Sequence, residues 1–232
     1  MLPGLTKSQI ASLRRRRLTR ASLQRLYKLD KTHPLFLGFP PAALAELQYC
    51  PQASLPLATA QKLGEKLRTE LRWLKKNLHV VGSVRRGNKA VVKDLDILVV
   101  APEGASDELA KAQIKAGGTL KILASYANGA RRRSIIVAYG RKKYRVDLFL
   151  AHERELPYAL YHHTGSRRYN IRLRNHAKSR GWKLNQYGLF ERTPPDFRGK
   201  PPRVKGSHRI KTEADLARFL GVTPRPPSAR EH

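Results

Sequence analysis

Two short stretches of sequence decide the expected fold: residues 81–87, VGSVRRG, and residues 94–97, DLDI. In the second stretch, Asp94 and Asp96 alternate with apolar residues in a run that extends to Ala101 and predicts a strand. Side chains two apart on a strand point to the same face, so we expect the two carboxylates to project together. In the first stretch, a predicted strand ends in a turn that holds two glycines, a serine and two arginines.

A third acid, Asp147, lies on another predicted strand, residues 143–150. If the two strands are neighbours, three carboxylates meet and raise one another's pKa, in a chain with only 17 acidic residues. Mg²⁺ explains such a cluster, because it prefers carboxylate oxygen together with substrate phosphate. We expect these three residues to bind two Mg²⁺ ions, with Mn²⁺ as an alternative, for a phosphoryl transfer. The competing interpretation is that Asp94 and Asp96 only line the solvent-exposed face of an edge strand and bind nothing.

The turn at residues 81–87 has the composition of a phosphate site. Gly82 lets the backbone approach a ligand closely, Ser83 offers a hydroxyl and a backbone N–H, and Arg86 can bind phosphate with two parallel hydrogen bonds. A phosphate site followed by a pair of metal-binding acids is what nucleotidyl transfer requires. One group holds the triphosphate while the other carries the metals.

The remaining pattern predicts an α+β fold. We expect helices at 56–76, 107–115, 154–163, 166–180 and 212–220, strands at 79–81, 94–101, 119–126, 133–139 and 143–150, and a hairpin at 183–190. These elements divide into four parts: a basic, helical and Pro-rich extension at 1–55, a catalytic unit with a small mixed sheet at 56–151, a C-terminal subdomain at 152–222, and a disordered tail at 223–232.

Composition points to a polyanionic partner. The chain has 47 Lys and Arg against 17 Asp and Glu, a net charge of +30, which indicates DNA, RNA or an anionic membrane as the partner. The absence of an apolar run of about 18 residues argues against a membrane span, and the absence of a secretory segment after Met1 predicts an intracellular protein. The single cysteine, Cys50, excludes an intramolecular disulfide.

The first 29 residues contain no acid and carry four consecutive arginines at 14–17. Apolar residues recur there at helical spacing and predict a basic amphipathic helix. We favour a nucleic-acid-binding arm; a solvated helix packed on the core and a transit peptide are the alternatives. Residues 33–56 are rich in proline and predict a linker with one short helix at 42–49.

The combination of motifs resembles the DNA polymerase beta superfamily of nucleotidyltransferases, and residues 163–174 (HTGSRRYNIRLR) and 182–190 (WKLNQYGLF) narrow the resemblance to the family X DNA polymerases. The resemblance covers about residues 56–222. It implies a palm at 56–151 and a thumb-like subdomain at 152–222, in a reduced form of the family without its N-terminal lyase region.

The resemblance implies a role for each residue of the acid cluster. Asp94 and Asp96 match the two aspartates that bind both metals, and Asp147 matches the third, the base or the residue that orients the base at the primer 3′-hydroxyl. Arg145 matches the arginine that pairs with that acid. These four residues are the expected catalytic group.

The resemblance also implies nucleotide contacts. Gly82, Ser83 and Arg86 match the triphosphate ligands, and His163 and Gly165 match the segment whose backbone lies against the sugar.

The helix after this segment supplies further implied contacts. Asn170 matches the asparagine that reaches the incoming nucleotide from the minor groove, and Arg174 matches an arginine that contacts the template strand. With Arg167, Arg168 and Lys178, Arg174 forms the expected DNA-binding set.

The sequence departs from the family at several positions. Lys93 stands where the family has a small residue, and His162 and His163 replace an aromatic pair, which puts sugar discrimination in doubt. Lys28 and Lys31 lack the motif of a lyase lysine, so we expect no deoxyribose-phosphate lyase activity.

The favoured function is a monomeric, DNA-directed DNA polymerase that adds dNTPs to a primer in gapped or nicked DNA during repair. The alternatives are template-independent or RNA-directed nucleotidyl transfer, and a non-catalytic nucleic-acid-binding protein. Primer extension with one dNTP at a time separates them.

Overall fold

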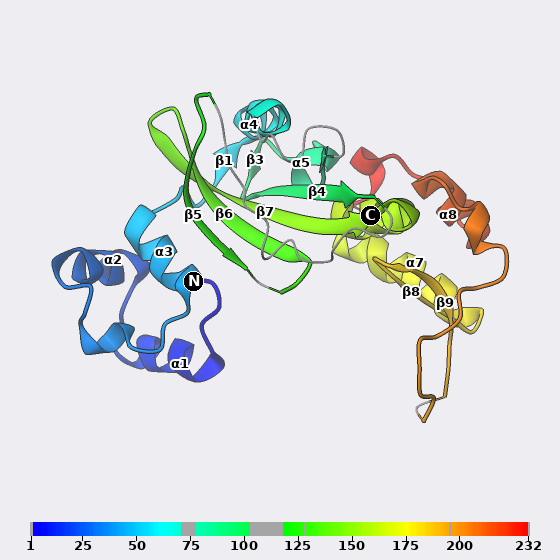
Figure 1. Ribbon diagram of the computed structural model, residues 1–232, viewed down its shortest axis with the longest axis horizontal. Helices are drawn as coiled ribbons and strands as arrows, with labels where there is room; N and C mark the ends of the chain where they lie inside the picture. The colour runs from blue at the N-terminus through cyan, green and yellow to red at the C-terminus, as the bar shows by residue number, and fades with distance from the viewer. Residues whose placement is uncertain (1, 71–77, 103–117, 128, 195, 232) are drawn as a thin grey trace.

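The computed structural model describes residues 2–70, 78–102, 118–127, 129–194 and 196–231. Three units follow one another along the molecule: a helical N-terminal unit, a central sheet, and a C-terminal unit of helices and a hairpin (Figure 1). The helix expected at 107–115 lies outside the described residues. Among the helices that are described, none combines the length and the apolarity needed to cross a membrane.

The central unit is built on a five-stranded sheet with the strand order β2-β4-β7-β6-β5. Its strands are β2 (Leu78–Val80), β4 (Leu95–Ala101), β5 (Lys121–Ala127), β6 (Arg132–Tyr139) and β7 (Lys142–His152). β4 and β7 run parallel and the other neighbours are antiparallel. The predicted mixed sheet is therefore confirmed, with β4 and β7 as direct neighbours.

The two faces of the sheet differ in what packs against them. On one face, Leu95, Ile97, Val146 and Leu148 pack against the helix α4 (Leu57–Glu70) in the main hydrophobic core. Alternation along the strands places Asp94, Asp96 and Asp147 on the other face, as the sequence predicted. The central unit also holds the antiparallel pair β1 (Leu55–Pro56) and β3 (Val91–Val92) and the short helix α5 (Gly82–Arg86).

The N-terminal unit has a hydrophobic core of its own. It consists of α1 (Lys7–Arg15), α2 (Arg20–Leu29), the 3-10 turn η1 (Pro34–Phe36) and α3 (Pro41–Tyr49). Thr6 and Thr19 cap two separate helices with capping boxes, where the sequence predicted one. The short helix expected at 42–49 is confirmed as α3. The expectation that residues 33–56 form a linker is wrong, since Phe36, Phe39 and Leu47 are buried in this core; aromatic packing outweighs the extended preference of the prolines.

The C-terminal unit holds α6 (Leu156–Thr164), α7 (Arg167–Ser179), the hairpin β8 (Trp182–Asn185) and β9 (Gly188–Glu191), and α8 (Glu213–Phe219) around a second core. Three 3-10 turns complete it: η2 (Glu153–Glu155), η3 (Ser207–Arg209) and η4 (Pro227–Ala229). These elements match the predicted helices and hairpin within a few residues.

The end of the chain is ordered, in contrast to the disordered tail that the sequence predicted. The Arg230 side chain donates to Glu213 at 2.6 Å and lies over the Tyr169 ring, and the Ser166 hydroxyl donates to the Arg230 carbonyl at 2.5 Å. Arg230 is only 4% exposed. A buried charge paired in this way fixes a segment whose proline-rich composition alone indicates disorder.

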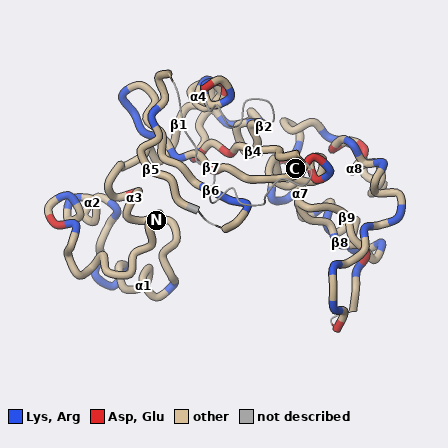
Figure 2. Tube along the Cα trace, in the orientation of Figure 1, with Lys and Arg blue, Asp and Glu red and all other residues tan. Residues whose placement is uncertain are grey.

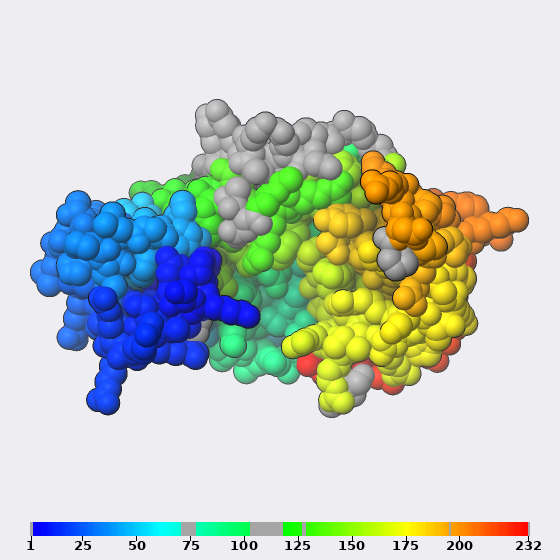
Figure 3. Space-filling view, turned by 90° about the horizontal axis from the view of Figure 1, so that it is seen from below, coloured from blue at the N-terminus to red at the C-terminus, as the bar shows by residue number. Residues whose placement is uncertain are grey.

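The N-terminal and C-terminal units flank the face of the sheet that α4 leaves open. α3 packs on β5 and β6 through Ala42, Tyr126 and Ile136, while α6 packs through Ala159 on Leu98 at the other end. Seen from below, the two units stand on either side of a hollow over the central unit (Figure 3). The sheet face that carries the three aspartates is therefore the one on which α3 and α6 of the two flanking units pack.

Candidate active site

The three acidic side chains expected to bind metal are gathered by the strand register. Asp96 and Asp147 are Cα partners in the parallel pair β4–β7, and Asp94 lies directly before β4. Asp147 is buried. Its Oδ1 accepts a hydrogen bond from Ser134 at 2.5 Å and its Oδ2 accepts one from Arg132 at 3.0 Å. The condition for the three carboxylates to meet, that the two strands are neighbours, is therefore met.

The turn at residues 82–86 forms the short helix α5 and contacts the same cluster. Gly82 has a φ of +63°, and a Cβ added there would lie 2.1 Å from Asp96 Oδ2. Only glycine accommodates both this backbone conformation and this approach. The backbone N–H of Val81 donates to the Asp96 carbonyl at 2.9 Å, which joins the turn to β4. Glycine at position 82 thus lets the expected phosphate site touch the acid pair.

Burial raises the pKa of Asp96 to about 7, with further contributions from the neighbouring carboxylates of Asp94 and Asp147. Arg132 and Arg145 only partly offset this repulsion. A divalent cation would relieve it, so the donor set fits a hard metal such as Mg²⁺. In the described residues no three acidic, histidine or cysteine side chains form a ready-made metal cage, and arginines hold two of the carboxylates.

Arg145 is shared among several acids. Its Nη2 donates to Asp94 Oδ2 at 2.9 Å, its Nε lies 4.0 Å from Asp147 Oδ1, and its Nη1 lies 3.7 Å from Glu46 Oε1. The expected pairing of Arg145 with the acid at 147 is thus weaker than its pairing with Asp94.

The two arginines of α5 reach the C-terminal unit. Arg85 donates to the Thr164 hydroxyl and to Glu213, each at 2.5 Å. Arg86 donates to the Thr164 carbonyl, and its Nε pairs with Glu231 at 2.6 Å. Arg86, the expected triphosphate ligand, is therefore engaged by a carboxylate of the chain's own tail, while Ser83 lies half-buried beside it.

The segment expected to face the sugar lies next to the acid cluster. The His163 ring stacks on Phe149, two residues after Asp147, with ring centroids 4.2 Å apart. Burial lowers the pKa of His163 to about 3, so the ring is neutral at pH 7. Gly165 has a φ of +71°, and a Cβ there would lie 3.3 Å from Arg86 Nη1. The structure brings His163 and Gly165 to the same side of the cleft as Arg86.

Asn170 is buried, and its side chain is oriented by the backbone. Its Nδ2 donates to the His162 carbonyl at 2.7 Å, and its Oδ1 has no hydrogen-bond partner among the described residues. In this arrangement Asn170 ties α7 to the segment before Gly165, where the resemblance implied a residue that faces the nucleotide.

The residues expected to bind DNA form an exposed basic strip on α7. Arg167, Arg174 and Lys178 follow one another at helical spacing, and Arg168 is adjacent. All four are exposed. Figure 2 shows further Lys and Arg along the N-terminal unit and the loops of the C-terminal unit, with few acids among them.

Four residues of the site were not expected from the sequence: Arg132, Ser134, Glu46 and Glu231. Ser134 of β6 is the Cα partner of Asp147, and Arg132 lies two residues away on the same face of that strand. Pairing the expected strands 133–139 and 143–150 as neighbours would have revealed Ser134. Glu46 and Glu231 come from distant parts of the chain, and their contacts depend on tertiary packing.

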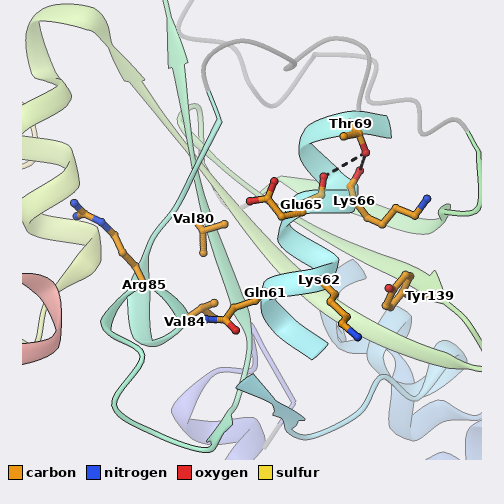
Figure 4. Close-up of a pocket in the computed structure, with 9 residues that line it drawn as sticks. All are labelled: Gln61, Lys62, Glu65, Lys66, Thr69, Val80, Val84, Arg85 and Tyr139. Carbon is orange, nitrogen blue, oxygen red and sulfur yellow. Dashed lines mark hydrogen bonds between the residues drawn. The ribbon is translucent and has the colours of Figure 1, made fainter. Parts of the chain in front are cut away.

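Two pockets lie near these elements. One of about 460 Å³ borders the cluster, with Arg132, Phe149, His163 and Tyr187 in its lining. Another of about 790 Å³ lies between α4, β2 and α5, with Lys62, Lys66 and Arg85 in its lining (Figure 4). Neither pocket has one of the three aspartates among its described lining residues. The first meets the cluster through Arg132, which pairs with Asp147, whereas the second lies beside α4, which covers the opposite face of the sheet.

Comparison with known proteins identifies the class of protein to which this chain belongs. A nucleotidyltransferase domain model matches residues 64–158, and a DNA polymerase beta thumb model matches residues 159–231. The chain therefore has a nucleotidyltransferase domain followed by a polymerase beta-type thumb.

Individual relatives narrow this class further. Repair DNA polymerase X of African swine fever virus (isolate Pig/Kenya/KEN-50/1950) is 32% identical over 188 residues, which cover 76% of this chain and 99% of the viral protein. The DNA polymerase/3′-5′ exonuclease PolX of Bacillus subtilis is 33% identical over 108 residues, 47% of this chain and 18% of that protein. The chain belongs to the family X DNA polymerases.

A solved structure supports the fold over the whole chain. Leishmania infantum polymerase beta in a ternary gap complex superposes with a TM-score of 0.71 at 20% identity, covering 100% of this chain and 87% of that one.

Proposed function

We propose that this protein is a template-directed polymerase that fills short gaps during DNA repair, adding dNTPs to a primer 3′-hydroxyl with release of pyrophosphate. The observation that carries the proposal is the register of Asp96 with Asp147, next to Asp94 and in contact with the turn at Gly82. Family membership supports polymerase chemistry, and the acid cluster supplies a place for it.

Asp94, Asp96 and Asp147 would hold two divalent cations, Mg²⁺ with Mn²⁺ as an alternative. When bound, such ions activate the attacking hydroxyl and offset the charge that develops on the phosphates. The close, mutually repelling carboxylates support this assignment, because the nearby arginines leave the buried Asp96 with a pKa raised to about 7.

The chain's own residues position the substrates. Ser83 and the backbone at Gly82 would hold the triphosphate together with Arg86, which would exchange its present partner Glu231 for phosphate oxygen. Asp147 would accept the proton of the primer hydroxyl, since Ser134 and Arg132 hold its two oxygens in a fixed orientation.

The cleft between the N-terminal and C-terminal units would bind duplex DNA. The strip of Arg167, Arg168, Arg174 and Lys178 lies in the thumb-like unit, and the net charge of +30 supports contact with many phosphates. We expect a monomer, with Asn170 and Arg174 turned toward the nascent base pair once DNA is bound.

Primer extension on a gapped duplex tests the proposal. We expect Asp94→Asn combined with Asp96→Asn to abolish extension while DNA binding remains. A matched control, Glu65→Gln combined with Glu153→Gln, removes two exposed carboxylates and should extend normally. Undiminished extension by the double aspartate variant would overturn the assignment of the site.

The same assay tests templating and gap recognition. Supplying one dNTP at a time should give incorporation only opposite its complement, and chelation of metal by EDTA should stop the reaction. Equal incorporation of all four nucleotides, whatever the template, would contradict template direction. Gapped substrates with and without a 5′-phosphate then measure whether the downstream end is recognised.

A further inference from the structure

The N-terminal unit reaches the acid cluster through one buried carboxylate, Glu46 of α3. Glu46 is 3% exposed. Its Oε2 pairs with Arg20 Nη2 at 2.7 Å, and its Oε1 lies 3.7 Å from Arg145 Nη1. Glu46 therefore stands between an arginine of the N-terminal unit and the arginine of the candidate active site.

The Glu46 oxygen at this contact, Oε1, lacks a hydrogen-bond partner within the described part of the chain, and so does Arg145 Nε, which lies 4.0 Å from Asp147 Oδ1. An unpaired acceptor and an unpaired donor in a buried site are costly. Because Arg145 Nη1 already lies 3.7 Å from the unpaired Glu46 Oε1, a small movement of Arg145 toward Glu46 would let the two groups bond directly.

Such a movement has a consequence at Asp94. Arg145 Nη2 donates a hydrogen bond to Asp94 Oδ2 at 2.9 Å. The proposed function assigns this oxygen to a divalent cation. The guanidinium and the cation compete for the same carboxylate, so the cation binds more tightly when Arg145 has another acceptor. Glu46 is the carboxylate in a position to be that acceptor.

The packing of α3 on the sheet fixes the position of Glu46 relative to Arg145. On the same helix, Ala42 packs against Tyr126 and Ile136, and Ile136 is the Cα partner of Arg145 in the β6–β7 ladder. The reach from Glu46 to Arg145 is therefore set by a docked helix and a strand register. Burial raises the pKa of Glu46, a cost that an apolar residue at this position would avoid.

We propose that Glu46 is a positioning residue for the polymerase site, which accepts the guanidinium of Arg145 as Arg145 releases Asp94. The N-terminal unit thereby lowers the concentration of divalent cation that the site requires. This inference rests on the proposed function, because it assumes that Asp94 binds a cation.

Substituting one or the other partner of the Arg20–Glu46 ion pair should change cation affinity in opposite directions. Glu46→Gln removes the alternative acceptor, so Arg145 stays on Asp94 and cation binding weakens. Arg20→Gln frees Glu46 from its competing partner and strengthens its pull on Arg145, so cation binding tightens. Both variants lose the Arg20–Glu46 pair, so a purely structural effect would change cation binding in the same direction.

Mn²⁺ affinity of the full chain without DNA, measured by calorimetry, is the first readout. We expect about a three- to tenfold weakening in Glu46→Gln, the size of effect of one partly buried ion pair, and a tightening in Arg20→Gln. The Mg²⁺ concentration for half-maximal extension should shift in the same two directions, with the KM for dNTP unchanged at saturating Mg²⁺. Equal shifts in both variants, or no shift, would overturn the inference.

Two further measurements keep the outcome interpretable. If Glu46→Gln fails to fold by thermal melting, Arg20→Gln alone decides: tighter Mn²⁺ binding supports the inference, and unchanged or weaker binding overturns it. The Asp94→Asn and Asp96→Asn double variant in the same extension assay tests the site itself. If that variant is inactive while the Glu46 and Arg20 variants behave alike, only the positioning role fails.

Discussion

Asp96 of β4 and Asp147 of β7 are direct partners in the only parallel strand pair of the described sheet. This register places carboxylates from segments about fifty residues apart in the chain on one face, beside a turn whose glycine touches one of them. The nucleotidyltransferase chemistry proposed for this chain depends on that relationship, and the following predictions test the groups around it.

Substitution of Gly82 should disable the site while leaving the fold intact. In Gly82→Ala the new Cβ would lie 2.1 Å from Asp96 Oδ2, so the carboxylate must move. We expect extension to fall about a hundredfold, as displacement of a catalytic group by about 1 Å can do. Gly87→Ala is the matched control, because Gly87 has a similar φ of +66° but nothing within 4 Å of an added Cβ. Equal activity of the two variants in single-turnover extension would contradict the prediction.

The hydroxyl of Ser134 should orient Asp147. Ser134 is buried and donates to Asp147 Oδ1 at 2.5 Å. We expect Ser134→Ala to slow extension about tenfold, since a hydrogen bond to a charged group is lost. Ser125→Ala, on the neighbouring strand, removes a hydroxyl that bonds Arg133 at 2.6 Å and should leave the rate unchanged. A rate loss shared by both variants would point to a general effect on the sheet.

The tail carboxylate should compete with the triphosphate. Glu231 pairs with Arg86 Nε at 2.6 Å, and its side chain is 29% exposed. We expect Glu231→Gln to lower the KM for dNTP by about threefold, the scale of one partly exposed ion pair, with kcat unchanged. Steady-state kinetics on a gapped primer measures both constants, and Glu153→Gln serves as a control at an exposed position. An unchanged KM would exclude competition by the tail.

Stability should fall in acid partly because of His163. Its pKa is lowered to about 3 in the folded protein, mainly by burial, whereas an unfolded histidine has a pKa of about 6.5. Between these values the unfolded chain binds the extra proton. The contribution of neutral His163 to the free energy of unfolding is therefore fully present above about pH 6.5. It is lost as the pH falls toward 3, at up to about 1.4 kcal/mol per pH unit.

His163→Phe isolates that contribution, because the ring can still stack on Phe149 but cannot take up a proton. We expect the free energy of unfolding in urea to fall less between pH 7 and pH 5 in the variant than in the unaltered protein. Identical pH dependence in the two proteins would show that His163 is protonated in the folded state as well.

The basic run at 14–17 should contribute to DNA affinity through salt-dependent binding of phosphates. Its four arginines are exposed in the N-terminal unit. Changing all four to Gln should reduce the slope of log affinity against log salt, by about 0.9 for each phosphate that the variant no longer neutralises. Lys62→Gln with Lys66→Gln, at the pocket away from the aspartates, should leave the slope nearly unchanged. Equal salt dependence of DNA affinity in the unaltered protein and both variants would show that the run at 14–17 does not contact DNA phosphates.

The sequence by itself determined the features that depend on local periodicity. The alternation at 94–101 placed two carboxylates on one strand face, and the helix expected at 212–220 is observed as α8, with Thr212 as its N-cap. The motifs at 81–87 and 163–174 identified the family, because each carries its chemistry within a few residues. These signals are read from neighbouring positions, where the chain geometry alone relates one side chain to the next.

Tertiary structure decided everything that joins distant segments. It set β7 beside β4, brought Arg132 and Ser134 to Asp147, docked Glu46 against Arg145, and ordered the tail through Arg230. Composition indicated a linker and a disordered end where buried aromatic rings and paired charges produce folded structure. Such contacts form only when separate elements pack together, so no local pattern encodes which arginine meets which acid.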